Sequence, residues 1–465
     1  MPSKILTLDR DSYGDAHASR RVESIARRLR YRAMGQECRS RGITELLFAH
    51  HADDQAETTL MRLANNYLGK GLAGMQYEAR IPECEGVYGV HESGSPGVLR
   101  SENLLVAKKG DGVRGAGMVV EGGGIAILRP LLRYTKDRLV ATCQEAGVKW
   151  VEDETNTDPS LTLRNTVRQL HESNLLPKAL RRPSLCAIAA RTSERAAQQE
   201  ERAHEIFRSL DIRVDTGSGH AICKIHRRTV DEIREGPDAD HIKAIILRKL
   251  LVLVAPTSNV DLSTLETASA AFLEPQSQAT PIVLAGVAAT RLGNTEEMLV
   301  YELRRTPPPR NKAKETRAEV GINVTSQPSN KEISWSEWHL WDERYWIRIG
   351  ASPRKHPEVV EVFIRMLMSE DIAVLRRDPQ TAKTSLHARL ASVKGHLRAT
   401  LPVIVRRDLP GEEGRNESIV ALPSLDWSRA EWLSKDGLAR DEDAKYFYDI
   451  RYKRIDESLT RPVGG

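Results

Sequence analysis

The sequence lacks paired cysteines and long apolar segments. Its five cysteines, spread over 465 residues, include no C-x-x-C pair, which argues against a zinc site and against a disulfide framework. The longest apolar stretch, around 245–255, is interrupted by Arg248 and Lys249, so we expect no membrane span. No internal repeat is present. These absences favour a globular protein of a reducing compartment.

We also expect no targeting signal. The N-terminal region is rich in arginine, but acidic residues such as Asp9 and Asp11 do not fit a transit peptide, and no apolar signal-peptide core follows. We therefore expect an intracellular protein, of the mitochondrion or the cytoplasm, and leave a homodimer open. The formal charge of +5 does not decide between nucleic acid and other partners.

The first third of the chain alternates between strand and helix patterns. Residues 3–10 predict a buried strand, 19–42 a helix, 43–51 a second strand and 53–68 a second helix. Residues 125–153 add a strand, a turn and a further helix. This alternation with short links predicts an α/β domain with a parallel, Rossmann-like sheet covered by helices.

The remaining segments differ in composition. Residues 85–124 hold eleven of the thirty-one glycines and no apolar periodicity, which indicates a long, flexible insertion in the first domain, 1–172. Residues 173–303 read as a helical middle region. Residues 304–332, rich in Pro, Lys and Asn, read as a disordered linker, and the aromatic-polar alternation after them predicts a small mixed α/β C-terminal domain, 333–465.

The segment LLFAHHADDQAETTLMRL, 46–63, carries the strongest chemical signal. His50 lies at the predicted carboxyl end of a parallel strand, the edge where open α/β sheets bind ligands. The spacing i, i+4, i+7 of His50, Asp54 and Glu57 would turn them to one side of a helix. Carboxylates there could hold Mg²⁺ on a nucleotide, with Asp54 as ligand, or take a proton from an amine.

Two other interpretations of this segment remain open. A carboxylate at the start of a helix is often a cap, so Asp53 or Asp54 could serve the helix itself. A zinc site built from His50, His51 and the aspartates is less favoured, because adjacent histidines that leave a strand face opposite sides.

Four stretches together resemble one protein family. They are ARRLRYRAM (26–34), AHHADDQAETTLMRL with GLAGM (49–75), LRPLLRYTKDRL (128–139) and EDETNTDPSLTLRNTVRQLHESNLLP (152–177). They are similar, in this order, to motifs of the tRNA(Ile)-lysidine synthetases of the pyrophosphate-loop ATP pyrophosphatase superfamily. The resemblance implies an adenine nucleotide alpha hydrolase-like domain that uses ATP and Mg²⁺.

The resemblance also implies a reaction and its residues. Such an enzyme adenylates the C2 carbonyl of the wobble cytidine of an isoleucine tRNA, and free lysine then displaces AMP. The implied catalytic residues are His50, Asp54, Glu57 and Arg129; the implied nucleotide- or substrate-binding residues are Arg30, His51 and Asp53. Arg164 and Arg168, at i, i+4 on one helix face, would bind RNA, with an ion pair of Arg164 as the structural alternative.

The family's first signature, S-G-G-x-D-S, does not occur in these 465 residues. The glycine-rich VEGGGIA, 120–126, lacks the Asp-Ser pair. Since this loop holds the pyrophosphate through backbone N–H groups, we expect an N-terminally incomplete domain that is inactive alone. A missed start codon or exon, a paralogue without catalysis, and a partner chain that supplies the missing half all remain open explanations.

Two other functions remain alternatives. One is a non-catalytic tRNA-binding protein. The other is a related pyrophosphate-loop enzyme that thiolates tRNA, which the scattered cysteines argue against.

Overall fold

The computed structural model describes residues 3–8, 22–99, 118–151, 163–173, 175–234, 236, 238–273, 281–294, 297–309, 317–320, 333–352, 361–382, 384–407, 417–435 and 445–462. The chain forms two compact units, and each is built from separate parts of the sequence. Unit 1 holds residues 1–85 and 124–202, and unit 2 holds 86–123 and 203–465. None of the helices in the described ranges is long and apolar enough to cross a membrane.

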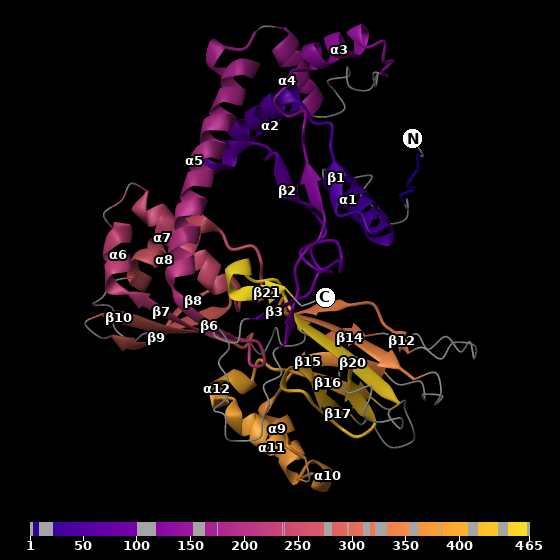
Figure 1. Ribbon diagram of the computed structural model, residues 1–465, viewed down its shortest axis with the longest axis vertical. Coiled ribbons are helices and arrows are strands. Elements are labelled where there is room, and N and C mark those ends of the chain that lie inside the picture. Colours follow the sequence, from indigo (N-terminus) through magenta and orange to yellow (C-terminus); the bar gives the residue numbers. More distant parts are fainter. Residues whose placement is uncertain are drawn as a thin grey trace. The chain divides into compact units, whose positions relative to one another are not determined.

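Unit 1 is a small α/β unit (Figure 1). Its elements, in chain order, are α1 (Val22–Ser40), β1 (Glu45–Leu47), α2 (Ala52–Ala64), η2 (Gly69–Ala73), β2 (Glu78–Arg80), β5 (Ala126–Leu128), α3 (Lys136–Glu145), α4 (Leu163–Glu172), η5 (Lys178–Leu180) and α5 (Arg182–Ser209), which continues into unit 2. The predicted helices at 19–42 and 53–68 and the strand–turn–helix at 125–153 are thus confirmed.

The sheet of unit 1 differs from the prediction. Its order is β1-β5-β2, and β1 pairs with β5 in parallel while β2 pairs with β5 in antiparallel. The sheet is therefore mixed rather than parallel. The strand predicted at 3–10 is wrong over the described residues 3–8, which form no strand and leave Ile5 91% exposed. A strand needs a neighbour for its backbone groups, and no described strand pairs with this segment.

A cluster of apolar side chains joins three helices of unit 1. Ala56 and Leu60 of α2, Val167 of α4 and Leu185 of α5 are all buried together. In α2 the apolar and charged residues share the inward face, since Asp54 and Glu57 are buried beside Ala56 and Leu60. This packing fixes α4 and α5 against the helix that carries the chemical motif.

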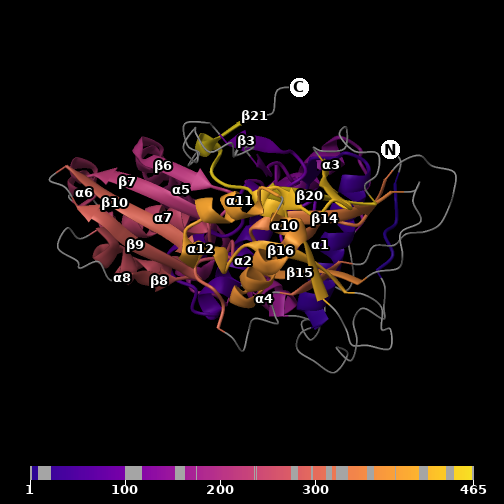
Figure 2. The same ribbon diagram turned by 90° about the horizontal axis from the view of Figure 1, so that it is seen from below.

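The described residues of unit 2 form three sheets. Five antiparallel strands in the order β6-β7-β10-β9-β8 form the first (Figure 2): β6 (Asp211–Asp215), β7 (His220–His226), β8 (Ile282–Leu284), β9 (Val287–Asn294) and β10 (Met298–Arg305). Helices α6 (Arg227–Arg234), α7 (Ala239–Val252) and α8 (Leu262–Leu273) belong to the same part of the chain. The middle region is therefore not only helical as predicted, although the buried helix expected near 240–255 is present as α7.

The other two sheets contain the C-terminal part. The sheet β11-β15-β16-β17-β18 joins β11 (Ala318–Val320), β15 (Glu361–Met366), β16 (Pro402–Arg407), β17 (Glu417–Leu422) and β18 (Trp427–Ser428). The remaining helices are α9 (Ser369–Arg377), α10 (Pro379–Ala382), α11 (Leu386–Ser392), α12 (Gly395–Arg398), η7 (Pro423–Leu425) and η9 (Glu457–Leu459). The predicted linker, 304–332, lies mostly outside the described residues, but β11 within it is a strand.

The third sheet includes two strands of the glycine-rich insertion. It contains β12 (Ser334–Trp335), β13 (His339–Trp341), β14 (Tyr345–Ala351), β19 (Trp432–Ser434), β20 (Tyr446–Tyr452) and β21 (Thr460–Pro462), together with β3 (Gly97–Leu99) and β4 (Val119–Val120). The segment of alternating aromatic and polar residues after 333 contains the antiparallel pair β13–β14. Residues 101–117 lie outside the described part, but the flanks of the insertion are strands of unit 2.

A buried carboxylate locks the insertion into this sheet. Glu121 accepts hydrogen bonds from the Tyr88 hydroxyl at 2.9 Å, from Gly94 N at 2.8 Å and from Arg451 Nη1 at 2.8 Å. Its side chain is 0% exposed. The Tyr88 ring stacks on Trp338 with centroids 4.7 Å apart. The segment is thus a structural part of unit 2, although its sequence interrupts unit 1.

Candidate active site

The motif on α2 begins with a reciprocal cap. His51 is the N-cap residue: its Nδ1 accepts from Asp54 N at 3.4 Å, and Asp54 Oδ2 accepts from His51 N at 3.0 Å. These bonds satisfy two backbone donors that the first helical turn leaves unpaired. Asp54 therefore caps the helix, as one interpretation of the sequence allowed. His50 precedes the cap, so the predicted helical spacing from His50 to Asp54 and Glu57 does not hold.

Two arginines of α4 hold the carboxylates of α2. Arg168 Nε donates to Glu57 Oε1 at 2.8 Å, and its Nη2 lies 3.7 Å from Asp54 Oδ1. Arg164 Nε lies 3.4 Å from Glu57 Oε2, while its Nη2 donates to Thr58 Oγ1 at 3.3 Å. Both arginines, predicted to bind RNA, thus contact the carboxylate pair in this structure.

Glu57 keeps one oxygen without a hydrogen bond. Within the described residues Oε2 is buried and lacks a donor of suitable geometry, although Arg164 lies close by. Burial raises the pKa of Glu57, against the opposing effect of Arg168. A buried carboxylate of raised pKa with a free acceptor lone pair is suited to accept a proton or a hydrogen bond from a ligand.

His50 lies beside Arg129 at the ends of β1 and β5. Arg129 Nε donates to His50 Nδ1 at 3.3 Å, and its Nη1 donates to Gln76 O at 2.8 Å. Burial lowers the pKa of His50, and the charge of Arg129 acts in the same direction while Asp54 opposes it. The imidazole is therefore neutral at pH 7, which matches an Nδ1 that accepts from Arg129.

A series of stacked rings connects His50 with α1. The rings of Phe48 and His50 have centroids 5.3 Å apart, and those of Tyr31 and Phe48 are 5.9 Å apart. Arg30 is exposed, with its guanidinium 5.9 Å from the centre of the Tyr31 ring. Arg30 therefore contacts the stacked rings through Tyr31. Among the described contacts, none joins Arg30 to the carboxylates of α2.

Asp53 joins three helices. Its Oδ2 accepts from Lys136 N at the start of α3 at 2.7 Å, and its Oδ1 lies 3.0 Å from Arg182 Nε of α5. The carboxylate at a helix N-terminus also complements the helix dipole. Asp53 was predicted to bind nucleotide or substrate, and in this structure it holds α3 and α5 against α2.

The loop after α2 depends on residues that the sequence analysis did not single out. Gln55 donates to Met75 O at 3.1 Å and accepts from Met75 N at 2.7 Å, and Arg62 donates to Gly71 O and Gly74 O. Gly74 has φ +65, and a Cβ there would lie 2.6 Å from the Gln55 amide. In the sequence, the glycines of GLAGM are the signal that could have indicated this close packing against Gln55.

The residues do not form a ready metal centre. No group of three or more His, Cys, Asp or Glu side chains gathers as metal ligands in the described ranges. Asp54, the predicted ligand, already serves His51 N and faces Arg168. Magnesium often uses one carboxylate together with substrate phosphates, but here the Asp54 carboxylate already has Arg168 as a cationic partner.

Comparison with known proteins matches a PP-loop domain over residues 3–87 and 101–175. The chain is 23% identical over 414 residues to the probable tRNA(Ile)-lysidine synthase of Schizosaccharomyces pombe, which covers 88% of this chain and 75% of that protein. It is 29% identical over 193 residues to the tRNA(Ile)-lysidine synthase of Rhodopseudomonas palustris, and this alignment covers 41% of this chain and 43% of that protein. It is 33% identical over 141 residues to the tRNA(Ile)-lysidine synthase of Bradyrhizobium diazoefficiens, and this alignment covers 30% of this chain and 28% of that protein.

The matched residues, 3–87 and 101–175, contain α1, β1, α2, β5 and α4 and thus the whole carboxylate–arginine cluster. The cluster therefore lies in an ATP-binding PP-loop domain. The chain thus contains a match to a PP-loop domain, and over both short and long alignments it is similar to tRNA(Ile)-lysidine synthases. The aligned parts span less than half of the two bacterial relatives.

Proposed function

We propose that this protein acts in the ATP-dependent formation of lysidine on the wobble cytidine of an isoleucine tRNA. The observation that carries the proposal is the meeting of Glu57, Asp54 and Arg168 beside the His50–Arg129 pair, all within the PP-loop domain. In the first step the C2 carbonyl oxygen attacks the α-phosphate of ATP and pyrophosphate leaves. In the second, the ε-amine of lysine attacks C2, and AMP leaves with that oxygen.

Each residue has a proposed task. Glu57 Oε2, which lacks a hydrogen-bond donor among the described residues, would receive the amine of lysine and accept its proton. Arg129 would stabilise negative charge that develops on phosphate, a role suited to its fixed set of donors. His50, His51, Asp53 and Arg30 would line the nucleotide and cytidine, and Arg164 and Arg168 would turn to RNA when a substrate is bound.

ATP and Mg²⁺ are proposed on the same basis. A bound Mg²⁺ would supply charge neutralisation of the phosphates, with Asp54 as the candidate ligand. We derive no step from it, because Asp54 faces Arg168 in this structure. For the domain organisation we propose that residues 1–172 carry the nucleotide chemistry and that the rest of the chain binds RNA.

We also infer that the 465-residue chain alone forms no lysidine, since it contains no S-G-G-x-D-S loop. Losing several charge-assisted hydrogen bonds, each worth about 1.5–3 kcal/mol, weakens ATP binding by orders of magnitude. The test measures incorporation of labelled lysine into an isoleucine tRNA transcript by this chain and by the same chain extended with an N-terminal segment that carries S-G-G-x-D-S. ATP turnover by the 465-residue chain would contradict the inference.

The rival function makes a different forecast. A non-catalytic tRNA-binding protein would retain tRNA but incorporate no lysine, even as the product with the added S-G-G-x-D-S segment. If that product is active, Glu57→Gln should lower the rate at least about hundredfold, the range of a lost general base. Glu78→Gln, at an exposed position of β2, is the matched control and should leave the rate unchanged.

A further inference from the structure

A polar pocket in unit 2 is lined by residues outside the stretches 3–87 and 101–175 that match the PP-loop domain. It encloses about 680 Å³. Its walls come from Glu92, the part of α5 from His204 onward, α7, the loop at 258–260 and the C-terminal segment 454–458, all within unit 2. Four lysine and arginine side chains line it, namely Arg208, Arg248, Lys249 and Arg454, and we call it the basic pocket.

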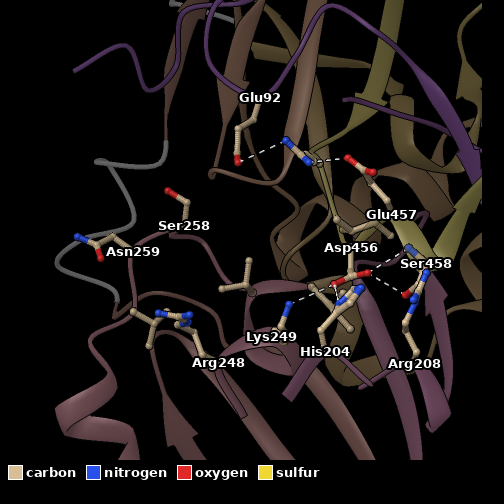
Figure 3. A pocket seen from close by; sticks show the side chains of 15 residues that line it. Glu92, His204, Arg208, Arg248, Lys249, Ser258, Asn259, Asp456, Glu457 and Ser458 are labelled. Atoms are coloured by element: carbon tan, nitrogen blue, oxygen red, sulfur yellow. Dashed lines mark hydrogen bonds and ion pairs between the residues drawn. The ribbon is translucent and has the colours of Figure 1, made fainter. Parts of the chain in front are cut away.

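Asp456 fixes one side of the basic pocket. It accepts hydrogen bonds from Ser458 N at 3.0 Å and Ser458 Oγ at 2.8 Å, and it lies 3.4 Å from Lys249 Nζ and 3.5 Å from His204 Nδ1 (Figure 3). These bonds help keep the pKa of Asp456 low although its burial acts in the opposite direction. The carboxylate is thus fully engaged and holds Lys249 and His204 in place.

A second set of acids serves Arg454. Its Nη2 lies 2.6 Å from Glu457 Oε1, and its Nη1 lies 3.7 Å from Glu92 Oε1 (Figure 3). Glu92, Asp456 and Glu457 are the acidic residues that line the basic pocket. Their contacts leave Arg208, which is exposed, without an ion-pair partner in the described part of unit 2.

The lining also shows which part of a ligand is recognised. Beside the cations it offers the hydroxyl group of Ser258 and the side-chain amide of Asn259. No Phe, Tyr or Trp side chain is present among the described side chains that line it, and the His204 ring is held beside Asp456, so a base has little aromatic surface on which to stack. Arginine, lysine, serine and asparagine are the side chains that typically contact phosphate oxygens.

We propose that the basic pocket binds a backbone phosphate group of RNA, with Arg208 and Arg248 as its principal contacts. The pocket is a positioning contact outside the PP-loop domain. It depends on the proposed function only for the identity of that RNA as a tRNA. Because phosphate contacts carry no sequence information, the pocket treats all tRNAs alike.

The test is tRNA binding by the full chain carrying Arg208→Gln and Arg248→Gln together. Fluorescence anisotropy with a labelled tRNA transcript is measured at several salt concentrations. We expect the Kd to rise about tenfold and the slope of log K against log salt to fall by about one to two, which corresponds to the lost phosphate contacts. The loss should be equal for an isoleucine tRNA and an unrelated tRNA.

The control is Arg376→Gln with Arg377→Gln, two exposed arginines of α9 in the same unit. It removes the same charge and should change the Kd by less than about twofold. If the pocket variant matches this control, the proposal is wrong. Binding of inorganic phosphate or AMP that needs the same arginines, with tRNA affinity unchanged, would overturn the RNA assignment in favour of a small anion.

Failure of this proposal and failure of the proposed function can be told apart. If the unmodified chain binds no tRNA, both the basic-pocket proposal and the proposed function are wrong. If it binds tRNA equally well with and without the two arginines, only the basic pocket loses its role. If the pocket variant binds tRNA weakly, the pocket is supported whether or not lysidine is formed.

Discussion

Arg168 Nε and Glu57 Oε1 meet at 2.8 Å although 111 residues separate them in the chain. The Glu57 side chain is 4% exposed and that of Arg168 is 25% exposed. The contact joins the helix of the chemical motif to α4, and Arg164 reinforces it from the previous turn. The pair is therefore both a packing contact and part of the candidate active site.

Removal of Arg168 should destabilise unit 1. Arg168→Gln leaves the buried Glu57 carboxylate without its strongest donor, and we expect a loss of about 2 kcal/mol in the free energy of unfolding. The measurement is urea denaturation of the single variants Arg168→Gln and Glu57→Gln and of the double variant. A double variant that loses the sum of both single losses would show that the two side chains do not interact.

Glu121 should be required for the stability of unit 2. Glu121→Gln removes the buried charge that faces Arg451 and weakens the bonds from Tyr88 and Gly94. Breaking a buried ion pair at one partner costs about 3–5 kcal/mol. Thermal unfolding should show a lower Tm for this variant. Glu370→Gln, at an exposed position of α9, is the control and should leave the Tm unchanged within a degree or two.

Gly219 should not tolerate a side chain. Its φ is +67, and a Cβ would lie 2.3 Å from Nη1 of Arg344. Arg344 is 0% exposed and is held by Asp342 at 2.7 Å and by Thr400 O at 2.7 Å, so it cannot move away cheaply.

Gly86 offers the matched comparison within unit 2. Its φ is +74, and a Cβ there meets no atom within 4 Å. Gly86→Ala should cost about 1 kcal/mol through the backbone alone, whereas Gly219→Ala should cost clearly more in the same denaturation experiment. Equal losses for the two variants would contradict the close approach of Arg344.

Lys453 should make the stability of unit 2 depend on pH. Burial lowers its pKa to about 7, and its ammonium donates to Ala255 O at 2.5 Å. Between pH 7 and about pH 10 the unfolded chain binds this proton and the folded chain does not, so the free energy of unfolding rises with pH. Below pH 7 both states are protonated, and the folded state has the full cost of the buried charge.

The corresponding experiment compares Lys453→Met with the unmodified chain at several pH values. The variant should gain about 2–4 kcal/mol relative to the unmodified chain when the pH is lowered from 10 to 7. The comparison cancels other groups that titrate in this range. Lys435→Met, at a half-exposed position, controls for the removal of a lysine. A pH-independent difference for Lys453→Met would refute the lowered pKa.

Local sequence patterns predicted the helices of unit 1 well. The period of apolar residues and the position of Gly42 gave α1, and the dense polar motif gave α2. The same patterns could not give the contacts of Arg168 or Arg182, because ion pairs between distant helices leave no local signal. Sequence spacing also placed His50 on a helix that in fact begins after His51.

The first two strands of the sheet in the middle region could have been predicted from the sequence. Residues 211–226 alternate between apolar and polar side chains around the turn Asp215–His220, and Gly219 has a positive φ in that turn. The long helices on either side favoured the interpretation of a mostly helical region. The strands β3 and β4 were beyond sequence reasoning, since two or three residues among many glycines form strands only when a distant partner supplies the hydrogen bonds.

The pairing of the insertion with the C-terminal strands has a consequence during protein synthesis. Arg451 follows Glu121 by 330 residues, so at about 5–20 residues per second the ribosome needs about 15–65 s to make the partner. Until then the nascent chain carries Glu121, Tyr88 and Val120 without the strand that buries them. Chaperones are well placed to shield this segment in the meantime, and a fragment that begins at residue 203 would leave the ribosome without two strands of its own sheet.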